Sequence, residues 1–181
     1  MRLIVQNSLA AIAVGLELRI SEEDMKIALG SFMGVKRRFT KVACIDEITI
    51  IDDYAHDPVE ILAVLKTVRS VCKGKIVAVI QPHRYSRLKN FLPEFVKCLE
   101  LSDYCFVVPI YSAGERSNGI DHFSLLKALN KGGKVIADFS QDVKTLKSKI
   151  SGVLAPGDFV VFLGAGDITR WAYQLADLMR E

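Results

Sequence analysis

Short apolar runs alternate with amphipathic segments along most of this chain. Residues 76–80 and 159–163 are almost wholly apolar and lack the alternation of polar and apolar positions found in half-exposed strands. Such runs are typical of strands that are buried on both faces of a sheet. Segments with helical periodicity and capping residues separate them. Buried strands joined by helices predict a mostly parallel sheet that is covered by helices on both sides.

From about residue 40 this alternation continues to the end of the chain. The pattern predicts strands at residues 41–45, 47–52, 75–80, 104–109, 134–137 and 158–163, with a tight turn at Asp46. Helices are expected at residues 57–72, with Glu60 at the capping-box position, at 86–101, from about 121, at 140–153 with Ser140 as the cap, and at 167–180. The fold class is therefore α/β, with a doubly wound, mostly parallel sheet over residues 40–181.

The first 39 residues have a different character. Residues 9–18 are rich in Ala and Leu and predict a helix, and Ser21 with Asp24 resembles a capping box that opens a second helix ending at Gly30. Two short helices cannot bury a core of their own. We therefore expect a helical fragment at residues 1–39 and a separate α/β domain at residues 40–181.

Composition narrows the possible classes of protein. The 24 basic and 21 acidic residues give a net charge of +3, which is too small to indicate binding to nucleic acid or to a membrane surface. No apolar run approaches the roughly 20 residues that span a bilayer, and residues 6–8 interrupt the apolar start before it reaches the length of a signal peptide. The four cysteines include no CxxC pair and have no histidine at zinc-ligand spacing. These features predict a cytoplasmic protein with reduced thiols and no metal site.

Open α/β sheets bind ligands at the carboxyl ends of their strands. In this chain the predicted strand ends carry most of the unusual polar residues. Four segments, which we call the rim, hold them: residues 52–57, 81–87, 111–115 and 164–167.

The first rim segment has three carboxylates and an imidazole within six residues, a composition suited to a ribose hydroxyl, a metal or a protonated amine. Asp57 precedes Pro58 and is explained as a helix N-cap, and Asp52 is explained as the end of a strand. For Asp53, Tyr54 and His56 a functional role is favoured.

The second rim segment contains Arg84 and Arg87 near the start of a predicted helix, with His83 beside them. Paired guanidinium groups bind carboxylates or phosphates through bidentate hydrogen bonds. Solvated surface side chains are an equally good interpretation of this pair. The glycines at 164 and 166 could bring backbone amides close to an anion or simply form the turn, since Thr169 stands where a third dinucleotide-binding glycine would be. No P-loop motif occurs in the chain.

The rim segments together resemble the bacterial Mur ligases. They read Asp-Asp-Tyr-Ala-His-Asp-Pro from residue 52, Gln-Pro-His-Arg-Tyr-Ser-Arg from 81, Tyr-Ser-Ala-Gly-Glu from 111 and Gly-Ala-Gly-Asp from 164. The second of these segments is similar to that of the family member that adds L-alanine to UDP-N-acetylmuramate. The family pairs His with Asn shortly before the position of Asn7, where this chain has Leu3 and Ile4.

The resemblance implies a Rossmann-like C-terminal Mur ligase domain at residues 40–181, with residues 1–39 as the tail of a central ATPase domain. It implies an ATP-dependent amide ligase that acts with Mg²⁺ in peptidoglycan synthesis, on L-alanine and UDP-N-acetylmuramate. By match, the resemblance assigns the nucleotide contacts to Asn7, Arg37 and Asp53. It assigns the amino-acid and acyl-phosphate side to Tyr54, His56, His83, Arg84 and Arg87.

The family's P-loop and UDP-sugar domain are absent from these residues, so we expect the isolated chain to be inactive. A separate chain that supplies those domains is one possible partner. Two other functions stay open at this point. One is a non-catalytic module that binds a nucleotide or another small molecule, and the other is a metal-dependent phosphohydrolase that uses Asp52, Asp53 and His56.

Overall fold

The computed structural model describes the backbone of residues 2–32 and 34–181 and the side chains of residues 7–32 and 34–181. The chain splits into two compact units, Met1–Val35 and Lys36–Glu181. The division falls slightly before the expected boundary near Thr40, because residues 36–39, which we call the linker, belong to the second unit and are hydrogen-bonded to it. The backbone N–H of Phe39 donates to Asp53 Oδ2 at 2.7 Å, and Arg37 Nη2 donates to the carbonyl oxygen of Gly164 at 2.6 Å.

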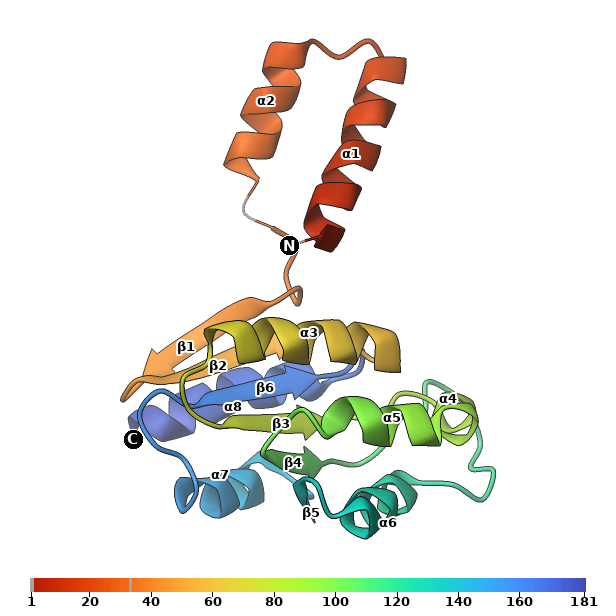
Figure 1. Ribbon diagram of the computed structural model, residues 1–181, viewed down its shortest axis with the longest axis vertical. Coiled ribbons are helices and arrows are strands. Elements are labelled where there is room, and N and C mark those ends of the chain that lie inside the picture. Colours follow the sequence, from red (N-terminus) through yellow and green to blue (C-terminus); the bar gives the residue numbers. More distant parts are fainter. Residues whose placement is uncertain (1, 33) are drawn as a thin grey trace. The chain divides into compact units, whose positions relative to one another are not determined.

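The first unit is a pair of helices, α1 (Arg2–Glu17) and α2 (Glu22–Ser31) (Figure 1). Ser21 is the N-cap of α2, as predicted, and its Oγ accepts from the N–H of Asp24 at 3.1 Å. No residue of α2 is buried. Large apolar side chains on both helices are exposed, so the pair buries little apolar surface within this unit.

The second unit contains a six-stranded sheet in the order β1-β2-β6-β3-β4-β5. The strands are β1 (Thr40–Ile45), β2 (Ile48–Asp53), β3 (Ile76–Ile80), β4 (Tyr104–Val107), β5 (Ile136–Phe139) and β6 (Phe159–Leu163). The helices are α3 (Pro58–Val71), α4 (Tyr85–Asn90), α5 (Leu92–Leu99), α6 (His122–Gly132), α7 (Val143–Ser151) and α8 (Ile168–Arg180). Only the β1–β2 pair is antiparallel among the described strands, which confirms the mostly parallel sheet.

The sheet has a hydrophobic core on each face. Along β3, Ile76, Ala78 and Ile80 belong to one core, with side chains of α3–α6. Val77 and Val79 belong to the other core, with side chains of α7 and α8. These two helices lie behind the sheet in Figure 1, and α3, α5 and α6 lie on the opposite side. The continuous apolar run of β3 is thus explained by burial on both faces.

Two details of the predicted helices are wrong. The helix expected at residues 86–101 is broken into α4 and α5 at Phe91, because Pro93 has no N–H to continue the hydrogen-bond ladder. The cap of α7 is Asp142, whose side chain accepts from the N–H of Thr145 at 2.8 Å, and not Ser140. The buried Ser140 hydroxyl instead donates to the carbonyl oxygen of Asp142 at 2.9 Å.

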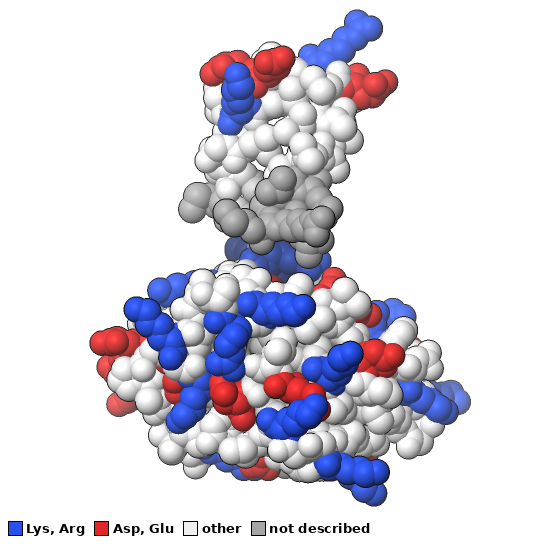
Figure 2. All heavy atoms as spheres, viewed as in Figure 1, with Lys and Arg blue, Asp and Glu red and all other residues white. Residues whose placement is uncertain are grey.

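Charged side chains of both signs are interspersed on the face of the second unit that Figure 2 presents. Across the described residues, no helix combines the length and apolarity needed to cross a membrane. All four cysteines are free thiols, and Cys98 and Cys105 are buried.

Candidate active site

The carboxyl ends of three adjacent strands bring the rim together. Strands β2, β6 and β3 are neighbours in the sheet and run parallel, so the loops that follow Asp53, Leu163 and Ile80 emerge at one edge. Figure 1 shows β3 and β6 pointing toward the side where α4 lies. The third rim segment, residues 111–115, joins them through a parallel bridge between His83 and Tyr111. The prediction that the four segments share one edge is confirmed.

Four rings form a continuous row across this edge. The ring centroids of Tyr54 and His56 lie 5.3 Å apart, and those of His56 and His83 also lie 5.3 Å apart, both in edge-on geometry. His83 stacks on Tyr111 at 5.5 Å with an interplanar angle of 11°. The row places the imidazoles of two different loops, those that follow β2 and β3, side by side. Tyr111 is a member that sequence reasoning left without a role.

His83 is held as a neutral imidazole. Burial, with further contributions from the nearby His56, Arg87 and Arg84, lowers the pKa of His83 to about 4. Arg87 Nη1 lies 3.2 Å from His83 Nδ1, and since a guanidinium can only donate, Nδ1 is the acceptor of this pair. The proton of the neutral ring is therefore assigned to Nε2, where it can be donated to a ligand.

Arg84 occupies an unusual backbone position. Its φ of 70° and ψ of 136° lie outside the regions that residues with a side chain normally adopt. Its N–H donates to the carbonyl oxygen of Tyr111 at 2.9 Å, which holds this conformation at the start of α4. The residue is exposed, beside the partly buried His83 and Arg87. This arrangement offers guanidinium donors and an imidazole N–H to an anion.

Asp53 and Arg37 are engaged within the chain. Asp53 is buried and accepts backbone N–H groups from Phe39 and Ala55, each at 2.7 Å. Burial nevertheless raises the pKa of its carboxyl group. Arg37 donates to the carbonyl oxygens of Gly164 and Gly166 and lies 3.8 Å from Asp52 Oδ2. Through these hydrogen bonds both residues attach the linker to the ends of β2 and β6. Their positions in the sequence did not indicate this role.

The neighbouring Arg38 is the more accessible of the two linker arginines. Its side chain is 54% exposed, against 23% for Arg37. It lies over the ring of Tyr54 at 5.6 Å and within 3.8 Å of Glu60. Asn7 is exposed on α1, in the first unit, and the side chains of Leu3 and Ile4 lie outside the described residues.

Gln81 connects the end of β3 to the start of α8. Its Nε2 donates to Asp167 Oδ1 at 2.8 Å, and its Oε1 accepts from the N–H of Ile168 at 3.3 Å. A Cβ on Gly166 would lie 2.6 Å from Tyr111 Cγ and would also contact Gln81 Oε1, so this position requires glycine for close approach. The sequence signal that could have identified this role is a polar residue placed directly after the apolar run at residues 76–80.

The carboxylates of the first rim segment do not form a set of metal ligands. Asp52 accepts from the Thr169 hydroxyl at 2.6 Å, Asp53 is bound to backbone amides, and His56 Nδ1 lies 3.0 Å from the carbonyl oxygen of Tyr54. Within the described part of the chain, no group of three or more His, Cys, Asp or Glu side chains is placed to hold a metal ion. The geometry gives no support to the phosphohydrolase alternative.

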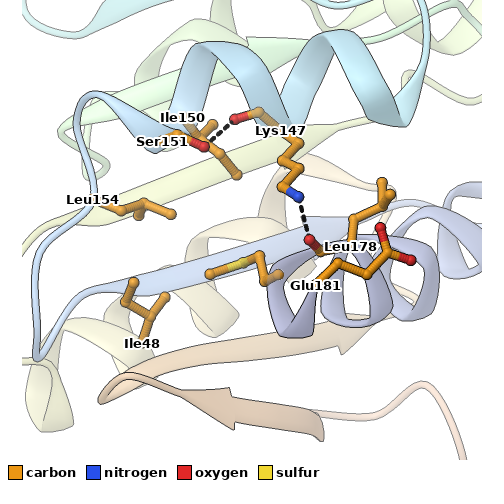
Figure 3. A pocket seen from close by; sticks show the side chains of 8 residues that line it. Ile48, Lys147, Ile150, Ser151, Leu154, Leu178 and Glu181 are labelled. Atoms are coloured by element: carbon orange, nitrogen blue, oxygen red, sulfur yellow. Dashed lines mark hydrogen bonds between the residues drawn. The ribbon is translucent and has the colours of Figure 1, made fainter.

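A pocket between α7, α8 and the start of β2 lies at the opposite edge of the sheet (Figure 3). The Lys147 ammonium group donates to the carbonyl oxygen of Leu178 across it. Apolar side chains such as Ile48, Ile150 and Met179 form much of the remaining wall. The pocket has no contact with the rim.

Comparisons with known proteins place this chain in context. A family model described as Mur ligase, glutamate ligase domain, matches residues 37–166. The UDP-N-acetylmuramate–L-alanine ligase of Paramagnetospirillum magneticum is 49% identical over 176 residues, which cover 96% of this chain and 37% of that protein. The chain therefore spans little more than a third of the length of this curated relative.

Solved structures agree with the family match. The crystal structure of the UDP-N-acetylmuramate–alanine ligase of Thermotoga maritima matches with a TM-score of 0.76 and 30% identity, over 97% of this chain and 37% of that one. A single domain from a Haemophilus ducreyi protein matches with a TM-score of 0.58 and 22% identity, over 78% of this chain and 99% of that one. The second match concerns the fold alone.

Proposed function

Because this chain belongs to the Mur ligase family, we propose that it forms the C-terminal part of an ATP-dependent ligase that joins L-alanine to UDP-N-acetylmuramate. The observation that carries the proposal is the convergence of His56, His83, Arg84 and Arg87 at the edge where parallel α/β sheets bind ligands. The identity of 49% to a ligase of that name supports the choice of amino acid.

In the proposed reaction, the muramate carboxylate attacks the γ-phosphorus of ATP, the bond to the β-phosphate oxygen breaks, and an acyl phosphate and ADP form. The neutral amine of L-alanine then attacks the acyl carbon and loses a proton, and the C–O bond to phosphate breaks, so that an amide and inorganic phosphate form. The part of this chain is to place the amino acid and to exclude water from the acyl phosphate.

The rim residues have separate parts in that placement. Arg84 and Arg87 bind the alanine carboxylate or the phosphate oxygens, which guanidinium groups match in geometry and charge. His83 donates from Nε2 to the same anion, since its Nδ1 is occupied by Arg87. Tyr54 and His56, whose rings meet edge-on, form the adjacent wall beside the reacting amine.

Nucleotide binding by this chain is proposed to be a secondary contribution. Asn7, Arg37 and Asp53 are the proposed contacts, and the internal hydrogen bonds of Arg37 and Asp53 mean that they would act mainly by holding the linker that faces the nucleotide. The rim donors fit an anionic group, whereas no carboxylate cluster in the described residues fits Mg²⁺. Mg²⁺ and the β- and γ-phosphates would be held by the P-loop of the central domain. The N-terminal and central domains would be supplied by a longer chain or by a separate partner chain. The proposed location is the cytoplasm.

A chimera tests the proposal directly. These 181 residues would replace the corresponding region of the P. magneticum ligase, and phosphate release would be measured with ATP, UDP-N-acetylmuramate and each of L-alanine, glycine and L-serine. We expect release that depends on both substrates and is fastest with L-alanine. A folded chimera without alanine-dependent release would refute the proposal.

The 181-residue chain by itself provides a second test. Without a P-loop it is expected to release no phosphate from ATP, and to bind Mg-ATP no more tightly than about 1 mM, or about 4 kcal/mol. Isothermal calorimetry measures this. A micromolar dissociation constant would place a complete nucleotide site on this chain, in support of a nucleotide-binding module.

A further inference from the structure

The start of α4 lacks the stabilising groups that a helix start normally has. Its N-cap residue, Arg84, makes no side-chain capping hydrogen bond, and the first turn contains no acidic residue. It contains Arg87 instead, so two cations lie near the end of the helix that disfavours positive charge. The position of α4 must therefore depend on groups from elsewhere in the chain.

Glu115 supplies such a group from the loop that follows β4. Its Oε2 accepts the backbone N–H of Ser86 at 2.9 Å, and its Oε1 accepts the Ser86 hydroxyl at 2.6 Å. Both carboxylate oxygens thus bind one residue of the first turn of α4, between the two arginines in sequence. These hydrogen bonds also lower the pKa of the Glu115 carboxyl group, which keeps it ionised.

The loop is shaped to deliver this carboxylate. Ala113 and Gly114 both have positive φ, 50° and 84°, and the N–H of Glu115 donates to the carbonyl oxygen of Ser112 at 3.0 Å, which closes a tight turn. The same loop begins at Tyr111, which pairs with His83 through its ring and with Arg84 through its backbone. One short segment therefore contacts His83, Arg84 and Ser86.

We propose that Glu115 is a positioning residue that holds the first turn of α4, and with it Arg84 and Arg87, in register with His83. It acts through Ser86, which both of its carboxylate oxygens bind. The inference rests on the proposed function for its kinetic consequence, while the Glu115–Ser86 contact can be tested in the 181-residue chain alone.

The structural arm of the test uses Glu115→Gln, with Glu94→Gln as the control. Glu94 is an exposed carboxylate in the first turn of α5, so its replacement removes the same charge outside the rim. In Glu115→Gln the Ser86 amide should exchange with solvent faster and its proton resonance should move upfield, and in Glu94→Gln neither should change. An unchanged Ser86 amide in Glu115→Gln would overturn the positioning role and leave the proposed function intact.

The kinetic arm uses the ligase chimera. Glu115→Gln should lower kcat/KM for L-alanine about 10- to 100-fold, the range for a small misplacement of binding groups, and Glu94→Gln should leave it unchanged. The double variant Arg84→Ala/Glu115→Gln should lose less than the product of the two single losses, because the effects of residues that act through one another are not independent. Losses that multiply would show that Glu115 does not act through Arg84 and would overturn the inference. A chimera that is inactive with Glu115 in place would refute the proposed function instead.

Discussion

Arg84 combines an exposed charge with a backbone conformation that opposes folding. A residue other than glycine at φ 70° and ψ 136° costs about 1–3 kcal/mol, and such strain tends to collect at functional sites. The hydrogen bond from its N–H to Tyr111 holds this conformation in place. The combination favours a functional interpretation of Arg84 over that of a solvated surface side chain.

Replacing Arg84 by alanine in the ligase chimera should therefore impair the reaction far more than the fold. We expect a loss of about 2–4 kcal/mol in transition-state stabilisation, the range for removing one preorganised donor, and only partial recovery in Arg84→Lys. Steady-state kinetics with L-alanine measure both. Kinetics equal to those of the unaltered chimera would remove Arg84 from the site.

Stability measurements on the same position give the complementary result. Arg84→Ala should leave the melting temperature nearly unchanged, because the side chain is exposed, and Arg84→Gly should raise it because glycine tolerates positive φ. A large loss of stability in Arg84→Ala would instead indicate a structural role.

His83 should make folding stability depend on pH. Its folded pKa of about 4 lies below the usual value near 6.5, so between these values the unfolded chain binds a proton that the folded chain does not. Stability is therefore expected to fall as pH decreases from about 6.5 toward 4, and His83→Gln should flatten this dependence. Urea unfolding across this range measures it. An NMR titration midpoint of His83 near 6.5 would contradict the prediction.

Some rim residues could be understood from sequence and others could not. Asp57 precedes a proline at a helix start, and its side chain does accept the N–H of Val59 at 3.0 Å. Asp53 and Arg37, in contrast, bind backbone groups of loops, and no periodic pattern in the sequence predicts the conformation of a loop. The carbonyl partners of Arg37 also lie more than 120 residues away in sequence. Local signals identify caps, whereas such long-range hydrogen bonds require the folded chain.

At the scale of elements, the junction between β6 and α8 is the tightest point of the rim. Gly164 and Gly166 both lie against Gln81, which is itself fixed by Asp167 and by the N–H of Ile168. The glycines were expected to serve either an anion or the turn. The structure shows that a side chain at either position would crowd Gln81, so close packing explains why glycine is present.

Gly166→Ala should consequently destabilise the α/β unit by about 1–3 kcal/mol, the usual range for inserting a methyl group where there is no space. Its Cβ would lie 2.6 Å from Tyr111 Cγ and also against Gln81. Gly152→Ala, at a helix end with nothing within 4 Å and a φ of −83°, is the control and should be neutral or slightly stabilising. Chemical unfolding of both variants measures the difference. Equal free energies of unfolding for the two variants would mean that the side chains of Tyr111 and Gln81 can move aside at little cost.

The elements were easier to predict than their arrangement. Apolar runs and caps identified every strand of the sheet, and the turn at Asp46 and Glu47 shows the positive φ values, 49° and 63°, of a tight hairpin. No pattern along the chain indicates that β6 lies between β2 and β3. That order depends on which faces pack in three dimensions, and it is what brings the first and last rim segments together.

At the scale of the whole molecule, the two units differ in how much apolar surface they bury. The α/β unit has a core on each face of its sheet, with Val77 and Ile80 fully buried. In α1 and α2 the side chains of Leu9, Leu16 and Ile27 are between 56% and 60% exposed. In the proposed full-length ligase these side chains would pack on the central domain, whose tail we propose α1 and α2 to be.

Hydrogen exchange on the 181-residue chain should therefore show two levels of protection. The α/β unit is expected to fold without further domains, so amides of β3 should exchange only through global unfolding, which for a domain of this kind requires about 5–15 kcal/mol. Amides between Leu9 and Leu29 should exchange by local opening at much lower cost, because short helices without a buried face are marginal in water. Mass spectrometry of peptides from both regions measures the difference. Equal protection of α1, α2 and β3 in a monomeric sample would show that the helical pair is stabilised within this chain.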